Sequence, residues 1–413
     1  MQKPQAVRGT RDLFGDDILK FNLVVDTARK VSEKYGFKQF ETPIFEFSDV
    51  FEKNLGETSD IIEKEVYKFK DRGDNYLTLR PEFTAGIVRA FLNNGPMQQQ
   101  LPQKLFSYGP VFRYDRPQKG RYRQFYQINC ECIGSSESYA DVETIKIAYD
   151  ILKDIGLKDI TLEINSLGCP ISMKKFEKAL IEYLNKYKDQ LSEDSKKRLE
   201  KNPLRILDSK DETDKKIVAN APIISEFYTK EAKEFFDQVL QGLKTIEIKY
   251  KINPLIVRGL DYYTSTVFEF TTNDLGAQNA VLGGGRYDDF VEQMGGKPTP
   301  AIGFGGGIDR MMLLTSQKVQ QTRAIAIVPI SDNENEFALK LANELREKNL
   351  CIEFLYSGKI KKKLDKANFL NAKYAIIIGE DEIKTGELTV KDLDKGENKK
   401  VVKDKLIQYI SQS

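Results

Sequence analysis

The first long hydrophobic pattern of the chain has helical spacing. Its apolar positions recur every three or four residues, at Ile18, Phe21, Val25, Ala28 and Val31. Two aspartates stand at its start, where a helix dipole favours negative charge, and a glycine follows its end. The pattern predicts a helix over residues 16–35. It is followed by an extended stretch over 40–46, whose proline marks an edge or an interrupted strand, and by a second helix over 84–93.

A hairpin with a long basic loop is predicted next. Two β-rich runs, 104–114 and 122–133, flank the polar loop 115–121. Strand alternation places one set of side chains on a common face: Arg123, Phe125, Gln127, Asn129 and Glu131. The opposite face, which is predicted to face the core, carries Ile128, Cys130 and Cys132. Arg113 faces in from the partner strand.

The composition of this loop favours a polyphosphate site over an ordinary amphipathic surface hairpin. Residues 113–123 contain four arginines, a lysine and a Pro-x-x-Gly turn. Guanidinium groups bind phosphate oxygens two at a time, and this makes them well suited to grip a nucleotide. We therefore expect anion binding at the mouth of the hairpin.

The remainder of the chain changes character twice. Lys, Glu, Asp and Leu with helical spacing predict a helical insertion at about residues 170–250, with its charge mostly on a solvated face. Strands are predicted over 255–258 and 266–271. A glycine-rich region over 276–307 follows, and a closing helix is predicted to begin within 311–314.

Beyond a boundary near residues 316–323, strands alternate with helices. The predicted elements are strands 324–330, 351–356, 374–378 and 388–392, and helices 334–348, 361–371 and 401–410. Such alternation is typical of a small parallel sheet covered on both faces. A lysine cluster at 359–363 lies at a predicted helix start, where it is equally consistent with phosphate contacts and with a solvated surface.

Composition narrows the chemistry. The 64 Lys and Arg nearly balance the 62 Asp and Glu, so the net charge of +2 excludes a histone-like polycation but not a locally basic nucleic-acid site. The chain contains no histidine, which excludes Ser-His-Asp triads and histidine-ligated metals. Its four cysteines are too few and scattered for a disulfide framework, and we expect no protein-held metal. Because there is no signal-peptide core and no apolar run of about 20 residues, we expect a cytoplasmic protein without membrane contact.

Several sequence strings resemble one enzyme family. The hairpin FRYDRPQKGRYRQFYQ is similar to motif 2 of the class II aminoacyl-tRNA synthetases in its histidyl form. FETPIFE at 40–46 resembles motif 1, and IGFGGGIDR at 302–310 resembles motif 3. VRGLDYYTSTVFEF, GGGRYD and LRPEFTAG are similar to signatures of the histidyl-tRNA synthetases. The resemblance covers essentially the whole chain. KNPLRILDSKD and AIIIGEDEIKTGELTVKDL are similar to bacterial members.

The resemblance implies a fold and a reaction. The expected fold is an α+β catalytic domain with a mainly antiparallel sheet over residues 1–320, carrying the helical insertion, and an anticodon-binding α/β domain over 323–413. The expected reaction is ATP-dependent activation of L-histidine to histidyl-adenylate and its transfer to the 3′ end of tRNA-His. ATP is expected to bring Mg²⁺ with it, and motif 1 implies a homodimer.

The resemblance also implies residue roles, carried over by matching positions. The expected catalytic residues are Arg258 and Arg113. ATP is expected to contact Arg113, Arg121, Arg123 and Arg310. Histidine is expected to contact Glu82, Thr84, Gln127, Glu131, Arg258, Tyr262 and Tyr263. The tRNA acceptor end is expected to contact Arg116, Gln118 and Lys119. Because the carboxylate of histidine is already ionised at pH 7, the first step needs no general base.

Three positions depart from the family pattern. Tyr114 and Tyr126 stand where the family usually has histidine, and Asp309 stands where it usually has glutamate. Tyrosine keeps a ring with a polar tip, whereas Asp309 shortens the side chain by one methylene. We expect both changes to be tolerated.

Two other functions are consistent with parts of the sequence. One is a histidine-sensing regulatory subunit of ATP phosphoribosyltransferase, a relative that generally lacks the anticodon domain and the catalytic arginines. The other is a non-enzymatic RNA-binding protein, which accounts for the basic loop but not for Glu131 and Tyr263. Retention of Arg113, Arg258 and Arg310, together with about 90 C-terminal residues, favours the enzyme.

Overall fold

The computed structural model forms two compact units, Met1–Val319 and Gln320–Ser413. It describes residues 3–52, 65–118, 120–256, 260–275, 279–319 and 322–411. Each unit has its own sheet and its own hydrophobic core, and each is described by itself. Among the helices within these ranges, none is both long and apolar enough to cross a membrane.

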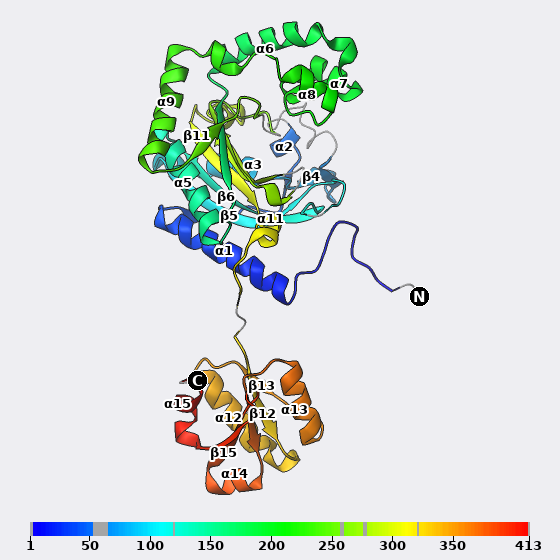
Figure 1. Ribbon diagram of the computed structural model, residues 1–413, viewed down its shortest axis with the longest axis vertical. Coiled ribbons are helices and arrows are strands. Elements are labelled where there is room, and N and C mark those ends of the chain that lie inside the picture. Colours follow the sequence, from blue (N-terminus) through cyan, green and yellow to red (C-terminus); the bar gives the residue numbers. More distant parts are fainter. Residues whose placement is uncertain are drawn as a thin grey trace. The chain divides into compact units, whose positions relative to one another are not determined.

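The first unit is built on an eight-stranded sheet in the order β1-β5-β6-β11-β10-β9-β7-β8 (Figure 1). Its strands are β1 (Lys38–Gln39), β5 (Gln103–Phe112), β6 (Gln124–Ile133), β7 (Thr161–Ser166), β8 (Tyr250–Ile252), β9 (Thr266–Thr271), β10 (Ala280–Arg286) and β11 (Ala301–Gly307). Neighbours from β5 across to β7 pair antiparallel, and only β1 with β5 and β7 with β8 pair parallel. The expected mainly antiparallel sheet is confirmed.

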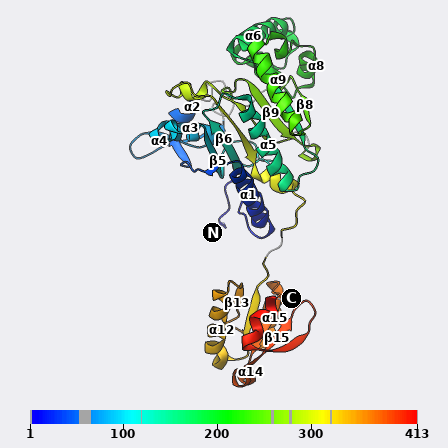
Figure 2. The same cartoon turned by 90° about the vertical axis from the view of Figure 1, so that its left-hand side faces the viewer.

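Helices cover both faces of this sheet (Figure 2). On one face lie α1 (Asp16–Lys34), α5 (Ser138–Asp154) and α11 (Ile308–Leu314). They bury the side chains that alternation assigned to the core, among them Ile128, Cys130 and Cys132. On the other face lie α2 (Asp49–Glu52), α3 (Thr84–Leu92) and α10 (Phe290–Gln293). The helices predicted over 16–35 and 84–93 are thus confirmed.

The predicted hairpin is confirmed as β5 and β6. Phe112 pairs with Gln124 at its mouth, and Gln103 pairs with Ile133 at its far end. The face that carries the polar side chains is not an exposed surface, however. Asn129 and Glu131 are fully buried, because α3 and its neighbours cover that face. The strand therefore runs from a basic mouth into a closed polar interior.

The insertion is helical, as predicted. It contains α6 (Pro170–Asn185), α7 (Glu193–Lys201), α8 (Glu212–Val218) and α9 (Lys230–Thr245), drawn in green in Figure 1. The first three surround a small core of their own. The last one, α9, instead packs on α5 and buries Phe236, Val239 and Leu243 in the core of the main sheet. The insertion is therefore anchored by α9.

The interrupted strand predicted over 40–46 is confirmed, whereas two other expectations for the first unit need correction. Residues 40–44 form no strand, and β2 begins only at Phe45 (Phe45–Phe47), because the preceding proline lacks a ladder donor. That strand joins β4 (Tyr76–Leu79) and β3 (Tyr67–Lys70) in a separate three-stranded sheet. The strand predicted over 255–258 is wrong in its described part: β8 ends at Ile252, and Asn253 accepts a turn hydrogen bond from the Leu255 N–H. The closing helix α11 begins earlier, at Ile308.

The second unit holds a five-stranded sheet in the order β13-β12-β14-β15-β16. Its elements are β12 (Ile325–Pro329), α12 (Asn335–Glu347), β13 (Ile352–Phe354), α13 (Ile360–Phe369), β14 (Tyr374–Ile378), α14 (Glu380–Thr385), β15 (Glu387–Asp392), β16 (Asn398–Val402) and α15 (Leu406–Ser411). The α/β alternation is confirmed, but only the first three strands are parallel. The final helix predicted from residue 401 is wrong at its start, because Val401 pairs with Leu388 in the β15–β16 hairpin.

Candidate active site

A cavity of about 860 Å³ opens at the mouth of the hairpin, in the first unit. It is lined by residues of β6, β9, β10 and β11, of the loop after β5, of α11 and of the insertion, and by Glu65. The volume lies within the range typical of pockets for nucleotides and other drug-sized ligands. Gln127 of β6 and the glycines Gly305 and Gly307 of β11 line it together.

Arg113 lies at the cavity with its guanidinium held in place. Its Nε donates to the Pro81 carbonyl oxygen at 2.9 Å, and its guanidinium carbon lies 5.4 Å from the centre of the Phe125 ring. Burial lowers the pKa of Arg113, while the nearby carboxylates of Glu65 and Glu82 act in the opposite direction. Arginine side chains stay protonated in proteins even when burial lowers their pKa. Arg113 therefore presents a fixed, poorly hydrated cation.

Two further arginines line the same cavity. Arg121 pairs with Asp115 at 2.8 Å, and Arg310 donates through Nε to the Gly120 carbonyl oxygen at 3.4 Å. Burial lowers the pKa of Arg310, and the positive charges of Arg121 and Arg113 lower it further. Cations that destabilise one another in this way favour a bound anion. Three of the four arginines predicted for ATP therefore lie together.

The fourth, Arg123, does not line the cavity. Its guanidinium carbon lies 3.8 Å from the centre of the Tyr114 ring, and its Nε donates to the Asp115 carbonyl oxygen at 3.4 Å. Its ATP contact is expected from the family resemblance. Strand alternation, which predicts only the face on which Arg123 lies, does not reach it, because β6 begins at Gln124. Arg258, the predicted catalytic cation, falls outside the described residues.

The predicted histidine contacts form one connected group at the start of α3. The Glu82 carboxylate accepts hydrogen bonds from the Thr84 N–H at 2.6 Å and the Ala85 N–H at 2.8 Å, a position where the helix dipole favours negative charge. The Thr84 hydroxyl donates to Glu131 Oε1 at 2.6 Å. The hydroxyl of Tyr287 donates to Glu131 Oε2 at 2.5 Å. Both carboxylate oxygens of Glu131 are thus engaged.

Burial makes Glu131 a weak acid. Only 1% of its surface is exposed, and this burial raises its pKa to about 8. The hydrogen bonds from Thr84 and Tyr287 lower the pKa, and the nearby charge of Glu82 raises it. Glu82 is also buried, and burial raises its pKa as well. At neutral pH, Glu131 can therefore carry a proton and either donate or accept a hydrogen bond.

The predicted tyrosines lie beside this group. Tyr262 is buried, with its ring centre 4.7 Å from that of Tyr263 and 4.6 Å from that of Phe290. The Tyr287 ring lies 5.6 Å from that of Tyr262. The structure thus brings Glu82, Thr84, Glu131, Tyr262 and Tyr263 together in one largely buried polar cluster beside aromatic rings.

Glycine at two strand positions permits close contacts, at Gly303 with Glu131 and at Gly284 with the neighbouring strand. A side-chain carbon on Gly303 of β11 would lie 1.6 Å from Glu131 Oε2. One on Gly284 of β10 would lie 2.0 Å from the carbonyl oxygen of Gly303. Glycine is therefore needed in these strands for two reasons. At some positions neighbouring atoms leave no space for a side chain, and at others a side chain would narrow the cavity.

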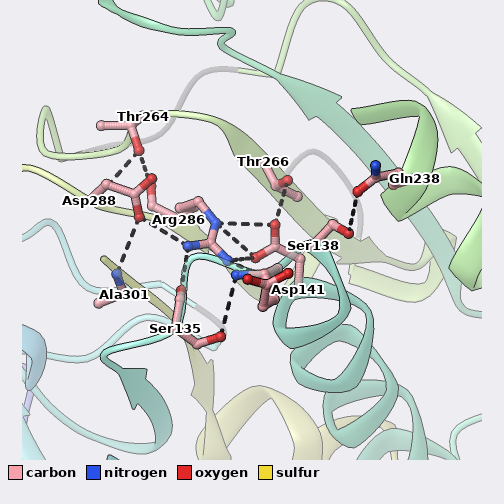
Figure 3. A network of polar contacts seen from close by, with 10 residues as sticks. Ser135, Ser138, Asp141, Gln238, Thr264, Thr266, Arg286, Asp288 and Ala301 are labelled. Atoms are coloured by element: carbon pink, nitrogen blue, oxygen red, sulfur yellow. Dashed lines mark hydrogen bonds and ion pairs between the residues drawn. The ribbon is translucent and has the colours of Figure 1, made fainter. Parts of the chain in front are cut away.

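The sequence motifs predict no role for the polar network next to Tyr287. The neighbouring Arg286 forms a buried ion pair with Asp141 at 2.7 Å and donates to the Ser135 carbonyl oxygen at 2.8 Å (Figure 3). Asp141 also accepts a hydrogen bond from Thr266 at 3.0 Å. The GGGRYD string contains Arg286 itself. Its partners Asp141 and Ser135, however, are more than 100 residues away in the chain, and no local sequence pattern connects them to it.

The three positions that depart from the family pattern have clear partners. Asp309 accepts hydrogen bonds from Arg11 at 2.7 Å and from the Tyr126 N–H at 2.9 Å. The Tyr126 ring packs edge-on against that of Phe21, with centres 4.9 Å apart. Tyr114 lies under Arg123. Asp309 therefore ties the N-terminal segment to β6.

The residues predicted for tRNA have different environments. Arg116 and Gln118 are exposed in the loop between the hairpin strands, and Lys119 falls outside the described residues. In the second unit, the lysine cluster at the start of α13 is only partly available. Lys363 is buried and donates to the Pro329 carbonyl oxygen at 2.8 Å, whereas Lys361 and Lys362 are exposed.

Comparisons with known proteins agree along the chain. The family model "Histidyl-tRNA synthetase" matches residues 9–311, and the model "Anticodon binding domain" matches residues 324–413. The chain is 52% identical to a histidine--tRNA ligase of Wolbachia pipientis (strain wPip), with 98% of this chain and 99% of that one covered. It is 49% identical to a ligase of the same name from Rickettsia bellii, with 100% and 99% covered. The solved apo histidyl-tRNA synthetase of S. aureus is 32% identical, with a TM-score of 0.83 over 98% of this chain and 99% of that one.

Proposed function

The chain belongs to the histidyl-tRNA synthetase family, and we propose that the cavity at the hairpin mouth performs the two steps of that family's reaction. In the first step the carboxylate of histidine attacks the α-phosphorus of ATP and pyrophosphate leaves. In the second step a ribose hydroxyl at the 3′ end of tRNA-His takes the histidyl group. The observation that carries the proposal is a buried carboxylic acid, Glu131, on the same strand whose mouth carries the arginine-lined cavity.

The arginines supply what the first step needs. The nucleophile is already ionised, so catalysis reduces to holding the two reactants in line and neutralising charge on the phosphates. Arg113 would hold the α-phosphate, with Arg121 and Arg310 on the other phosphates. Arg258 remains the proposed catalytic cation because of its place in the VRGLDYYT string. Arg123 would order the loop rather than contact ATP.

Mg²⁺ would enter as part of the ATP substrate. The described residues contain no cluster of three acidic or thiol side chains that could hold a metal by themselves. Glu65 and Glu269 line the arginine-rich cavity. One or two carboxylates together with substrate phosphates form a common Mg²⁺ site, so these two glutamates suit an ion that ATP brings.

The buried polar cluster around Glu131 suits the recognition of histidine. An imidazole offers one N–H donor and one nitrogen acceptor, and a protonated Glu131 together with Tyr263 can satisfy both. Glu82, Thr84 and Gln127 would contact the ammonium and carboxylate groups, with Tyr262 forming the wall. An amino acid that lacks the ring nitrogens would leave these buried groups unpaired, so discrimination follows without editing.

The regulatory-subunit alternative has less support. The chain keeps Arg113 and Arg310 in the cavity, and it keeps a complete second unit that matches the anticodon-binding model. Its similarity to ligases runs over the full length of both chains. We therefore propose that the second unit binds tRNA-His. A cytoplasmic location, where tRNA is charged, goes with it.

A homodimer is also part of the proposal. The three-stranded sheet and the segment leading into it expose large apolar side chains, namely Ile44, Phe45, Phe47, Phe69 and Tyr76. Such a patch is typical of a protein interface, and it includes the motif 1 stretch. Sedimentation at twice the chain mass of 47.3 kDa would support a second copy as its occupant. A monomer at micromolar concentration would contradict it.

Exchange of labelled pyrophosphate into ATP, dependent on added histidine, tests the first step directly. Arg113→Lys keeps the charge but loses the bidentate fork, so we expect exchange to fall by about 10²-fold or more. Arg116→Lys is the matched control, because Arg116 is exposed in the tRNA-facing loop and exchange requires no tRNA. If the wild-type chain gives no histidine-dependent exchange, the proposed function is wrong.

A further inference from the structure

The insertion contributes a wall to the cavity. Residues 192–194 and 208–211 line it, together with Arg198 and Arg205. These residues come from the ends of α7 and from the segment that leads into α8. The predicted helical insertion therefore lines the cavity, although its sequence pattern predicts a mostly solvated charged face.

Asp214 fixes the two halves of this wall to each other. Its buried carboxylate accepts hydrogen bonds from the hydroxyls of Ser192 at 2.7 Å, Ser195 at 2.6 Å and Ser209 at 2.6 Å. It also accepts one from the Ser192 N–H at 2.9 Å. Burial opposes the charged form, but these hydrogen bonds outweigh it and lower the pKa of Asp214. The wall is consequently a preformed structure rather than a loose loop.

Asn202 reaches from this wall to the main sheet domain. It lies between α7 and the following 3-10 turn, Pro203–Ile206. Its N–H donates to the Arg198 carbonyl oxygen at 2.7 Å, and its own carbonyl oxygen accepts from the Arg205 N–H at 3.1 Å. With its backbone held on both sides, its side-chain Nδ2 donates to Asp261 Oδ1 at 3.1 Å.

Asp261 belongs to the loop that carries the histidine-facing tyrosines. The next residue, Tyr262, is buried against Tyr263 and Tyr287, and Tyr287 donates to Glu131. The hydrogen bond from Asn202 therefore attaches the insertion to residues immediately before the aromatic wall of the proposed histidine pocket. The two partners are 59 positions apart in the chain.

We propose that Asn202 is a positioning residue: through its hydrogen bond to Asp261, the insertion sets the loop of Tyr262 and Tyr263 for histidine. The inference rests on the proposed function of the cavity and adds to it a role for the KNPLRILDSKD string. Asn202 itself is not among the residues that line the cavity. Its loss acts on how well the loop is preorganised, so it raises the KM for histidine more than the KM for ATP.

Histidine-dependent pyrophosphate exchange by the full chain, combined with a double-mutant cycle, tests the inference. Asn202→Asp places two carboxylates opposite each other, and we expect the KM for histidine to rise about five- to tenfold. Asp261→Asn alone keeps an amide-to-amide hydrogen bond and changes the KM less. The double variant restores a donor and an acceptor in reversed order, so the KM for histidine should return to within about twofold of wild type.

Two controls separate positioning from folding and from failure of the proposed function. Asn220→Ala removes a comparable asparagine side chain of the insertion, whose Nδ2 bonds only within its own segment, to the Lys216 carbonyl oxygen at 3.5 Å, and it should leave both KM values unchanged. Unfolding temperatures confirm that each variant folds. If Asn202→Asp raises the KM equally with and without Asp261→Asn, the inference is wrong even though wild-type exchange stands. Equal loss in the KM for ATP would also overturn it.

Discussion

At the residue scale, Glu131 shows how burial changes the chemistry of an ordinary strand carboxylate. Its two oxygens accept hydrogen bonds from Thr84 and Tyr287, and yet its pKa is raised to about 8, because burial outweighs those bonds. A group that carries a proton in the folded chain and loses it in the unfolded chain makes stability depend on pH.

The sign of that dependence is opposite to that of a salt-bridged acid. Below pH 4.5, the ordinary pKa of the group, Glu131 is protonated in both states and contributes no difference. Between 4.5 and about 8 the unfolded chain releases the proton and the folded chain keeps it, so the folded chain loses stability as pH rises. Glu131→Gln keeps the neutral shape and cannot ionise. We expect its free energy of unfolding to exceed that of wild type increasingly from pH 5 to pH 9, measured by urea unfolding. Parallel pH profiles of the two proteins would contradict this.

At the scale of elements, the strands β10 and β11 are shaped by what must pass beside them. The carboxylate of Glu131 occupies the space that a side chain at position 303 would fill, with only 1.6 Å available. A side-chain carbon added to Gly305, two residues further along the same strand, would lie 3.6 Å from its nearest neighbour, Asn129 Nδ2. Two glycines of one motif therefore have different reasons to be glycine.

Gly303→Ala should separate these reasons. The added methyl group must displace Glu131 or the backbone of Cys130, so we expect a loss of about 2–4 kcal/mol in the free energy of unfolding, together with loss of histidine-dependent exchange. Gly305→Ala serves as the control for stability, because its methyl group has room. Adding Glu131→Ala to Gly303→Ala should recover only part of the stability, because the Cys130 carbonyl oxygen still lies 2.6 Å from the methyl group, and it should recover none of the exchange. Equal stability losses for the two single alanine variants would contradict the steric explanation.

Patterns along the chain predicted the elements best where periodicity and pairing are local. The helix α1, the β5–β6 hairpin and the strand β9 follow directly from spacing. The final helix did not, because apolar residues at 401, 402 and 406 suit a helix or an edge strand equally, and only pairing with β15 decides between them. The residues of the candidate site show the same limit of local patterns. Glu82, Thr84 and Glu131 were predicted through the family resemblance, whereas Asp141 and Asn202 act through partners that no local spacing reveals.

At the scale of the whole molecule, we propose that the two units divide the reaction between them. The first unit contains the whole cavity and all the residues proposed for activation of histidine. The second unit exposes Tyr356 at the end of β13, where Lys366 lies 5.9 Å from the ring centre and α13 begins with the exposed Lys361 and Lys362. An exposed aromatic ring among lysines is typical of single-stranded nucleic-acid contacts.

Charging and exchange should therefore respond differently to a change in the second unit. Stacking of a base on an aromatic ring contributes about 1–3 kcal/mol, so Tyr356→Ala should raise the KM for tRNA-His in aminoacylation about five- to a hundredfold. Pyrophosphate exchange, which needs no tRNA, should stay within about twofold of wild type. Tyr139→Ala is a matched control, because Tyr139 of α5 is 71% exposed and Tyr356 is 68% exposed, but Tyr139 lies in the first unit. If Tyr356→Ala lowered exchange as much as charging, the second unit would have to act on the activation step, and the division of labour would be wrong. If it changed neither, Tyr356 would not be a contact for tRNA.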